Sequence, residues 1–336
     1  MNRLDFLSTT LLSALGLPLA ARSTPESAAI IRPPFLREGD RIAITSPAGF
    51  VTEKDVQPAV ALLRSWGFGV ELGRTIGKRA GSFGGSDEER TSDLQHWINS
   101  TQVKAILCAR GGYGAVRIVD RLDFSPLLHH PKWIIGFSDI TVLHCHLNRR
   151  YGIASLHAKM TNSFPEDWNK ADALQQETIL TIRDALLGKP MEYSAPPHPL
   201  NRLGHASGPL VGGNLRTIEN LAGSASDLRT VNKILFVEDT GEYLYSIDRM
   251  FRNLQRSGKL DHLAGLIIGG FKIKPSEDPS EEFGRKLEEI VLDVLPDCNY
   301  PVCFDFPVGH QRNNRALRCG MTHHLRVSNT GSILNG

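Results

Sequence analysis

The chain has 336 residues, of which 41% are hydrophobic and 22% are charged, and this length and composition predict two globular domains with a sizeable core. The formal net charge is only +2 and the basic side chains are scattered, so nothing in the charge pattern favours nucleic acid or a membrane surface as a partner. The five cysteines form no C-x-x-C pair, which argues against a zinc ribbon or a disulfide framework.

The N-terminal segment differs from the rest of the chain. It reads MNRLDFLSTTLLSALGLPLAARS, with an early cation at Arg3, an apolar stretch over residues 6–19 and small residues at Ala20 and Ala21. This pattern is typical of a signal peptide and is too short for a membrane-spanning helix. We therefore predict a leader over residues 1–24, export to the periplasm and no stable membrane insertion after leader removal. The alternative is a cytoplasmic protein with an apolar arm.

Strand-like and helix-like segments alternate in the first half of the chain. Strands are expected at 40–50, 103–109 and 132–138, and helices at 56–70, at 81–99 after a glycine loop, and at 139–152. Ser86 and Glu89 have the S-x-x-E spacing of a helix capping box. The alternation predicts an α/β domain with a parallel sheet over residues 36–187.

A proline-rich segment separates this domain from the second half. We predict a linker at 188–206, because prolines cluster there and apolar residues are few. The expected elements beyond it are a loop and helix at 212–224, strands at 233–239, 263–271 and 301–310, and an amphipathic helix at 242–258. These elements predict a smaller α/β or mainly β domain over residues 207–330.

Ser138 lies at the carboxyl end of a predicted strand, in WIIGFSDIT, directly before a predicted helix. Ligands gather at this end of parallel strands, and the unpaired amides of the first helical turn can bind an oxyanion. Ser138 is therefore a candidate nucleophile, although the G-x-S-x-G pattern is not met. The alternative is that Ser138 only caps the helix.

A serine nucleophile needs a base, and the base needs an acid that orients it. Glu238 and Asp239 follow an apolar strand in ILFVEDTGE, and His310 follows another in CFDFPVGH. Each has a structural alternative, since the acids could cap the next helix and the histidine could be a surface residue. The coincidence of a serine, an acid and a histidine just past apolar strands favours a catalytic triad.

The glycine-rich segment ARGGYGAVRIVD, at 109–120, is a second candidate site. Gly111, Gly112 and Gly114 permit close approach of a ligand to the backbone, but their spacing fits neither a dinucleotide fingerprint nor a P-loop. The loop is either a structural turn or a source of amides for a reaction centre, and Arg110 could pair with a substrate carboxylate. The histidines have no metal-binding spacing, so we predict no metal site.

Five segments together resemble the LD-carboxypeptidases of peptidase family S66, also called muramoyltetrapeptide carboxypeptidases. They are ARGGYGAVRIVD, GFSDIT, FVEDTGEYLYSIDRMF, LAGLIIGGF and FPVGH, and the resemblance runs from about residue 41 to about residue 325. It implies an N-terminal Rossmann-like domain with a parallel sheet and a smaller C-terminal α/β domain of a β-rich, swivelling kind.

The resemblance also implies a Ser-Glu-His triad between the two domains. Carried over, Ser138 is the nucleophile, Glu238 orients the base and His310 is the general base. The amides of Gly112 and Asp139 correspond to the oxyanion hole. The implied reaction removes the terminal D-alanine of the murein tetrapeptide by cutting a bond between an L-centre and a D-residue. The resemblance further implies no metal or other cofactor, and a homodimer.

Two segments depart from the family pattern. Where the family has H-G-P-M, this chain has HAKM at 157–160, with Ala158 and Lys159 as the changed residues. The usual apolar segment after the histidine is replaced by QRNNRALR, which runs to Arg318 and contains Arg312. Both departures bear on substrate identity more than on chemistry. Two alternatives stay open: an S66 immunity peptidase that cleaves peptidyl or aminoacyl nucleotides, and an exported protein that holds a peptide without cutting it.

Overall fold

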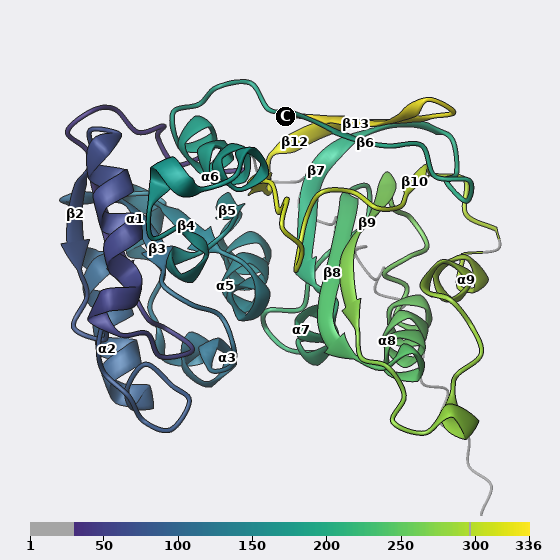
Figure 1. Ribbon diagram of the computed structural model, residues 1–336, viewed down its shortest axis with the longest axis horizontal. Coiled ribbons are helices and arrows are strands. Elements are labelled where there is room, and N and C mark those ends of the chain that lie inside the picture. Colours follow the sequence, from purple (N-terminus) through teal and green to yellow (C-terminus); the bar gives the residue numbers. More distant parts are fainter. Residues whose placement is uncertain (1–29, 296) are drawn as a thin grey trace, which may run out of the picture.

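Two β-sheets that lie side by side carry the fold (Figure 1). The computed structural model describes residues 30–295 and 297–336, so the predicted leader at 1–24 lies outside the described residues. One sheet has six strands in the order β11-β5-β4-β3-β1-β2, and the other has seven in the order β10-β9-β8-β7-β12-β13-β6. The predicted α/β architecture with two sheet-based parts is confirmed.

The first sheet is parallel except at one edge. Its strands from the first half of the chain are β1 (Arg41–Thr45), β2 (Gly69–Leu72), β3 (Val103–Cys108), β4 (Trp133–Gly136) and β5 (Ser155–His157). All neighbouring pairs among these strands are parallel, as predicted. Strand β11 (Leu317–Cys319) pairs antiparallel with β5, so a segment from near the C-terminus completes the first sheet.

Helices pack on the first sheet. They are α1 (Glu53–Ser65), α2 (Asp87–Asn99), α3 (Ala115–Ile118), α4 (Pro126–His129), α5 (Thr141–His146) and α6 (Ala173–Leu186). The predicted capping box of α2 is present, because the Ser86 hydroxyl accepts from the Glu89 amide and the Glu89 carboxylate accepts from the Ser86 amide. Among the residues described, no helix combines the length and apolar character needed to cross a membrane.

The alternation of side chains along the strands explains why both faces of this sheet are covered. In β1, Ala43 belongs to one apolar cluster with Leu94 and Ile98 of α2, whereas Ile42 and Ile44 belong to a second cluster with side chains of α1. Successive side chains of a strand point to opposite faces, so each strand contributes to both clusters. Both clusters also contain side chains from the second sheet, so the two halves of the chain are packed together.

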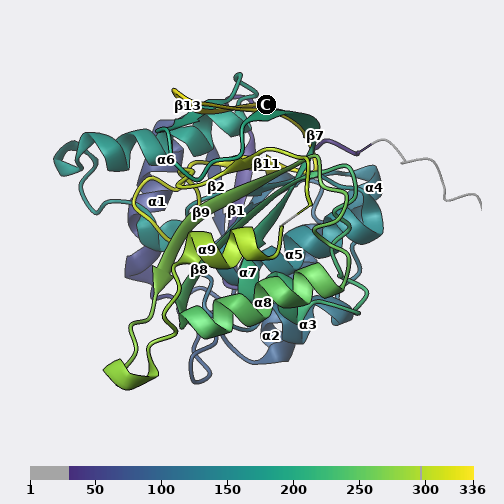
Figure 2. The same ribbon diagram turned by 90° about the vertical axis from the view of Figure 1, so that its right-hand side faces the viewer.

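The second sheet is mixed. Its strands are β6 (Glu192–Ala195), β7 (Gly204–Asn214), β8 (Ile234–Glu242), β9 (Gly265–Ile273), β10 (Val302–Cys303), β12 (Thr322–Ser328) and β13 (Gly331–Asn335). Strands β7 to β10 pair in parallel, and β12, β13 and β6 extend the sheet in antiparallel pairs. The helices of this half are α7 (Leu215–Asn220), α8 (Leu244–Arg256) and α9 (Leu287–Asp293), and α8 and α9 lie in front of the β8 and β9 strands in Figure 2.

The segment predicted as a linker, 188–206, contains a strand. Residues of β6 pair with β13 at the edge of the second sheet, so part of this segment belongs to that sheet. Pro190, Pro196 and Pro197 flank the strand. Proline has no amide hydrogen to donate to a ladder and is accommodated at sheet edges, so the prolines mark an edge strand here as well as a connection.

Two further expectations for the second half were wrong in extent. The strand expected over 301–310 is reduced to β10, and the rest of the segment is a loop in which Asp305 has a φ of 55°. Gly212 and Gly213 lie at the end of β7 and not in a loop. The sequence analysis also did not predict the β12–β13 hairpin.

Candidate active site

Ser138 follows β4 at the carboxyl end of the first sheet. Strand β4 ends at Gly136, and a 3-10 turn, Ser138–Ile140, leads into α5. Ser138 has a φ of 62°, a left-handed conformation that is costly for a residue with a side chain and recurs at functional sites. No side-chain capping bond begins the turn, so the geometry does not favour a purely capping role.

The predicted glycine loop lies against Ser138. A Cβ atom at Gly111 would lie 3.0 Å from the Cβ of Ser138 and 3.2 Å from its Oγ, so glycine allows the backbone to approach the hydroxyl. The next residue, Gly112, has a φ of 91°. Across residues 30–295 and 297–336, its amide donates no hydrogen bond. A free amide beside a serine hydroxyl is the kind of donor that stabilises an oxyanion.

The Asp139 side chain ties the turn after β4 to the glycine loop. Its Oδ2 accepts a hydrogen bond of 2.8 Å from the amide of Ala115, the first residue of α3. Burial raises the pKa of Asp139 to about 6, although the bond from Ala115 and the charge of Arg90 act in the opposite direction. The carboxylate thus fixes the loop, and any contribution of Asp139 to an oxyanion hole would come from its backbone amide.

Glu238 and His310 form a hydrogen-bonded pair. Glu238 lies in β8 and is fully buried, and its Oε2 lies 2.5 Å from Nδ1 of His310. The imidazole is 16% exposed, so its other face is open to a small ligand. A carboxylate on Nδ1 holds the ring in one tautomer and leaves Nε2 available as a base.

The neighbouring acid, Asp239, has a different set of contacts. Its carboxylate accepts hydrogen bonds from Asn214 Nδ2 and from the amides of Arg216 and Thr240. Asp239 therefore holds the start of α7 against β8. Of the two acids that the sequence leaves open, only Glu238 reaches the histidine.

Ser138 and His310 lie near one another across the boundary between the sheets. The ring of Phe137, the residue before Ser138, lies 5.0 Å from the imidazole of His310, measured between centroids. Within the described part of the chain, no hydrogen bond joins the Ser138 hydroxyl to His310. Catalytic hydrogen bonds are often long in the absence of substrate and tighten when it binds, so this arrangement suits a triad that closes on its substrate.

The two sheets are also joined by a direct contact close to Ser138. The Oγ1 of Thr141, in the first turn of α5, accepts a hydrogen bond of 3.0 Å from the Asn214 amide at the end of β7. Asn214 is in turn the register partner of Glu238 in β8. This contact fixes the strand end that carries the acid relative to the turn that carries the serine.

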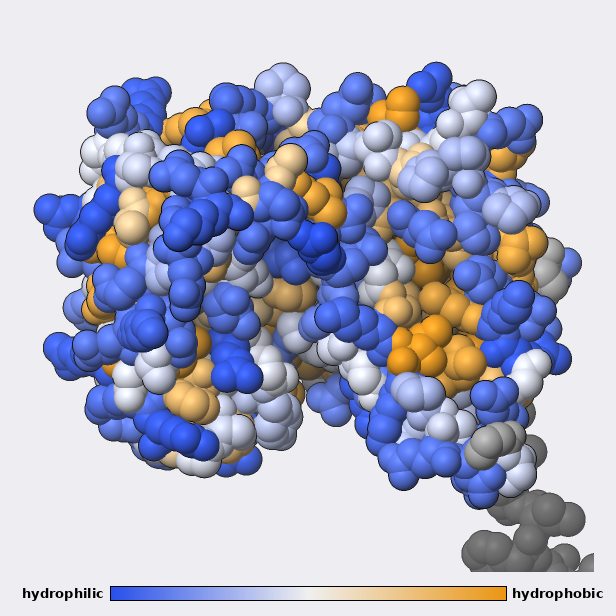
Figure 3. Space-filling model, viewed as in Figure 1, coloured by the Kyte–Doolittle hydropathy of each residue, from blue (hydrophilic) through white to orange (hydrophobic). Residues whose placement is uncertain are grey.

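A pocket of about 300 Å³ opens at Ser138, and a notch between the two halves of the molecule is visible in Figure 3. The first half contributes Gly112, Tyr113, Val116, Ser138, Asp139 and Val142, and the second half contributes Asn214, Arg216, Thr217, Asn220, Asp239, Thr240 and Glu242. The candidate nucleophile and the free amide of the glycine loop thus face one shared space.

Arg110 does not line this pocket. Its guanidinium donates a hydrogen bond of 3.2 Å to the Phe50 carbonyl and lies 5.9 Å from the centroid of the Phe50 ring. The structure therefore brings Ser138, Gly112 and Asp139 together and places Glu238 and His310 beside them. It does not place Arg110 with them.

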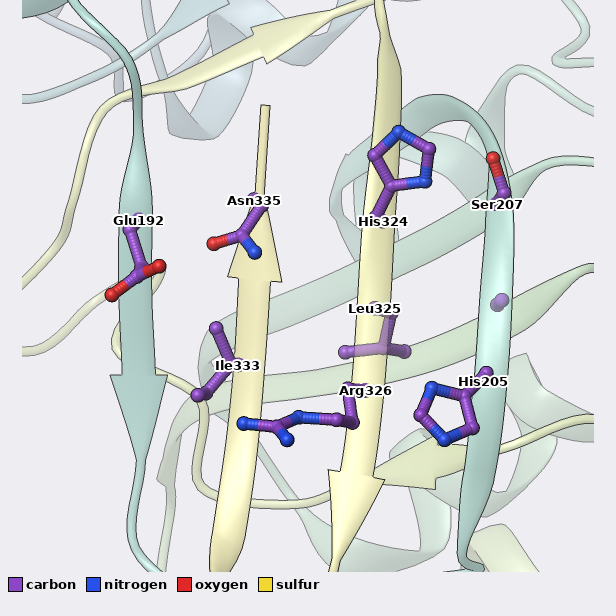
Figure 4. A pocket seen from close by; sticks show the side chains of 9 residues that line it. Glu192, His205, Ser207, His324, Leu325, Arg326, Ile333 and Asn335 are labelled. Carbon is purple, nitrogen blue, oxygen red and sulfur yellow. The ribbon is translucent and has the colours of Figure 1, made fainter.

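A shallow hollow of about 500 Å³ lies on the second sheet and is lined by residues of β7, β12, β13 and β6 (Figure 4). It carries a serine, two histidines and an acid, namely Ser207, His205, His324 and Glu192. In the described residues no hydrogen bond links Ser207 to either histidine. The same residue types occur here without the buried acid–base pair found at Glu238.

A groove of about 980 Å³ runs beside β9 and reaches Gln311, the residue after His310. Aromatic residues line it, including Tyr243, Tyr245 and Phe283. Apolar side chains are exposed on this half of the molecule (Figure 3). The groove offers a surface along which a substrate longer than one residue could extend from the candidate site.

Residues that the sequence analysis did not select hold His310 in place. Asn314 Oδ1 accepts a hydrogen bond of 2.8 Å from the Gly309 amide and lies 3.3 Å from Nε2 of His157. The backbone of Gly309 also bridges to Gly270 in β9. Two of these residues could have been selected from the sequence, because Gly309 directly precedes the candidate base and His157 begins the HAKM segment.

We expect Gly309→Ala to disrupt the acid–base pair. Gly309 has a φ of 101°, and a Cβ there would lie 2.3 Å from the Cβ of Glu238, so the variant combines backbone strain with a clash. The expected result is a loss of about 2–4 kcal/mol in the free energy of unfolding and a drop in peptidase activity of at least about 10-fold.

Gly223→Ala is the matched control for this variant. Gly223 has a φ of 76°, and a Cβ there would have nothing within 4 Å, so it carries the backbone cost without the clash. Thermal unfolding and turnover would be measured for both variants. Equal effects of the two substitutions would show that contact with Glu238 is unimportant.

Comparison with known proteins shows that this two-domain α/β chain belongs to the carboxypeptidase class. The profile of the LD-carboxypeptidase N-terminal domain matches residues 42–158, and that of the LD-carboxypeptidase C-terminal domain matches residues 207–325. The chain belongs to the LD-carboxypeptidase family, peptidase family S66.

Curated relatives are named for murein peptides. The probable murein peptide carboxypeptidase of Bacillus subtilis is 32% identical over 310 residues, which cover 90% of this chain and 94% of that protein. The murein tetrapeptide carboxypeptidase of Pseudomonas aeruginosa is 28% identical, with 84% of this chain and 92% of that protein covered. The family and these relatives identify a hydrolase of the peptidase type, related to peptidoglycan carboxypeptidases.

Solved structures show the same fold. The muramoyltetrapeptide carboxypeptidase of Oxalobacter formigenes matches with a TM-score of 0.76 and 28% identity, covering 88% of this chain and 98% of that one. MccF in complex with glutamyl sulfamoyl guanosine matches with a TM-score of 0.78 and 20% identity, covering 92% and 99%. At that identity the second match speaks only for the fold.

Proposed function

We propose that the protein is a serine carboxypeptidase that releases the terminal D-alanine of murein tetrapeptides in peptidoglycan turnover or recycling. The observation that carries the proposal is the buried Glu238–His310 pair next to Ser138, in a chain whose family and relatives are murein carboxypeptidases. Ser138 follows β4, Glu238 lies in β8, and the loop that carries His310 is joined to β9 through Gly309, so the sheets position all three side chains.

The reaction begins when His310 Nε2 takes the proton of the Ser138 hydroxyl and the oxygen attacks the carbonyl carbon of the last peptide bond. Glu238 keeps the imidazole oriented and stabilises its protonated form. The negative charge on the carbonyl oxygen is received by the amides of Gly112 and Asp139; one such donor lowers the barrier by about 3 kcal/mol in comparable sites.

The tetrahedral intermediate then breaks at its carbon–nitrogen bond. His310 gives its proton to the nitrogen of the departing D-alanine, and the acyl group stays on Ser138 as an ester. A water molecule, deprotonated by His310, attacks the ester and releases the tripeptide with a free carboxylate. The complete reaction consumes one water molecule for each peptide bond that it cuts.

The test is to incubate the purified protein with disaccharide tetrapeptide and to analyse the products by mass spectrometry. We expect a mass loss equal to one alanine residue, together with free D-alanine. A tetrapeptide that stays intact, or a product cut at another bond, would contradict the proposal.

The second candidate is an immunity-type peptidase that cleaves aminoacyl nucleotides. The aromatic groove beside Gln311 favours this candidate, because aromatic rings can stack on a nucleobase. Hydrolysis of an aminoacyl sulfamoyl adenosine would be measured beside that of the tetrapeptide, and the larger kcat/KM decides between the two. A protein that binds the tetrapeptide but cleaves neither compound would be the non-catalytic binding protein.

Export to the periplasm and dimerisation remain predictions. The leader that supports export lies outside the described residues, and the homodimer is implied by family resemblance alone. Detection of the mature N-terminus in a periplasmic fraction would test the first prediction, and sedimentation of the purified protein would test the second.

A further inference from the structure

The two segments that depart from the family pattern meet in one pocket. Lys159, from the HAKM segment, and Arg312, from the segment after His310, line a pocket of about 280 Å³. Its remaining lining residues are Ser163, Gln175, Thr178 and Ile179. Lys159 and Arg312, which are 153 positions apart in the sequence (312 minus 159), thus contribute two cations to one pocket.

Lys159 lies in the immediate surroundings of His310. Its Nζ donates a hydrogen bond of 2.7 Å to the carbonyl oxygen of Gln311, the residue after the base. The same Nζ lies 5.5 Å from the centroid of the Phe137 ring, and that ring lies 5.0 Å from the His310 imidazole. Since an ammonium group has three donors, one bond to Gln311 leaves donors for a ligand.

No acidic side chain of the described residues lies within ion-pair distance of Lys159. Arg312, at the rim, does have such a partner, because it pairs with Asp172. The inner cation of the pocket is therefore partly buried and lacks a counter-charge from the described protein. A partly buried charge without a counter-ion is costly unless a ligand supplies one.

A second polar group points to a ligand in this pocket. Thr178 is 1% exposed, and its Oγ1 has no hydrogen-bond partner in the described part of the chain. Thr178 lines the pocket together with Lys159. Buried hydroxyl groups nearly always have a partner, so a polar ligand atom would satisfy both the hydroxyl and the ammonium.

We propose that Lys159 binds the free C-terminal carboxylate of the substrate and so determines that the enzyme acts as a carboxypeptidase. The proposal rests on the function proposed above. His310 must lie within about 3 Å of the leaving nitrogen to protonate it, and the carboxylate carbon of D-alanine is only two bonds from that nitrogen. The carboxylate therefore lies close to His310, whose neighbour Gln311 is hydrogen-bonded to Lys159.

The assignment replaces Arg110, which the sequence suggested for this task. Arg110 donates a hydrogen bond to the Phe50 carbonyl, whereas Lys159 donates one to the carbonyl of Gln311, the residue after the candidate base. Lys159 is a specificity-determining residue in this account, because it contacts the substrate without taking part in proton transfer or bond making. Arg312 adds positive charge at the rim of the same pocket.

The acid–base properties of Lys159 make the proposal dependent on pH. Burial, together with the charge of Lys272, lowers the pKa of Lys159 to about 8, while the charge of Glu238 acts to raise it. The other titratable or cationic groups around it are His157, His310 and Arg312. Lys159 is therefore charged at pH 7 and loses its charge as the pH rises through about 8.

The test compares two substrates, the tetrapeptide and its C-terminal D-alanine amide, which lacks the carboxylate charge. In the unmodified enzyme we expect kcat/KM for the acid to exceed that for the amide. Lys159→Met keeps the length of the side chain and removes the charge, and should lower this preference by roughly 10- to 100-fold. Lys159→Arg should keep most of the preference, and Arg110→Met should keep all of it.

The amide also controls for folding, since Lys159→Met should lose at least about 10-fold less activity on it than on the acid. Equal loss of activity on both substrates would mean that Lys159 only supports the loop around His310, and the proposal would be overturned. An unchanged acid preference in Lys159→Met, or its loss in Arg110→Met, would overturn it as well.

Two further arms complete the experiment. A tetrapeptide amidated at its second residue keeps the terminal carboxylate, and Lys159→Met should lower its hydrolysis, relative to that of the terminal amide, as much as it does for the tetrapeptide without this change. The acid preference of the unmodified enzyme should fall as the pH passes about 8. If the unmodified enzyme cuts the last peptide bond of neither substrate, it is the proposed function that has failed.

Discussion

Replacing Ser138 by alanine is expected to lower kcat for D-alanine release by about 10⁴- to 10⁶-fold while leaving the fold intact. In the proposed mechanism the substitution removes the oxygen that forms the acyl-enzyme. The left-handed backbone at this position, with a φ of 62°, does not depend on the hydroxyl. Turnover of the tetrapeptide and the thermal unfolding curve would be measured on the same preparation.

Ser207→Ala is the matched control for this prediction. Ser207 lies in the outer hollow of the second sheet, beside His205 and His324, and is exposed (Figure 4). Its removal should change activity by less than about 2-fold, because exposed substitutions away from a site are nearly neutral. Release of D-alanine by Ser138→Ala at the unmodified rate would rule out this serine as the nucleophile.

Much of the first sheet could be predicted from the sequence, because its signals are local. Buried strands such as Val103–Cys108 appear as short apolar runs, and the capping box at Ser86 marks the start of α2. Ser138 could be selected for a similar reason. A polar residue directly after a buried strand lies at the sheet edge where ligands bind.

The parts that could not be predicted depend on contacts between distant segments. Strand β11, Leu317–Cys319, is a short run that joins the first sheet only because β5 offers a free edge. The strand β6 is surrounded by prolines, which in a sequence indicate a connection as readily as an edge strand. The residue pattern within each segment therefore does not predict that β11 and β6 are strands of these sheets.

In the candidate site, too, some features could be predicted from the sequence and others depend on the fold. Glu238 and Asp239 are equivalent in the sequence, and only the fold shows that one reaches His310 while the other accepts hydrogen bonds from Asn214. Arg110 was a reasonable carboxylate partner by chemistry, but its side chain is directed to Phe50. Residue type therefore predicts what a side chain can do, and the fold decides which one is in place to do it.

A strained residue and an unsatisfied polar atom lie where the proposed chemistry occurs. Ser138 has a left-handed backbone, and Glu238 Oε1 is buried with no partner in the described residues. Each feature costs stability, of the order of 1–3 kcal/mol. Their location in one small region argues for a role in function, since a structural core has no need to retain either of them.

Glu238→Gln is expected to lower kcat by about 10⁴-fold with KM little changed, because a neutral amide no longer holds and stabilises the protonated imidazole. The side chain keeps its size in a site where Glu238 is fully buried, so packing is largely preserved. An amide can also donate its N–H₂ to Nδ1 of His310, which would fix the tautomer that cannot act as a base at Nε2.

Asp239→Asn separates this catalytic effect from a general effect of changing an acid in β8. Asp239 accepts from Asn214 and from the amides of Arg216 and Thr240, so its loss should lower the free energy of unfolding by about 1–3 kcal/mol. Its effect on kcat should be at least about 100-fold smaller than that of Glu238→Gln, because it has no contact with the imidazole. The opposite order, with Asp239→Asn the more damaging to kcat, would assign the orienting acid to Asp239 and require His310 to turn toward it in the enzyme–substrate complex.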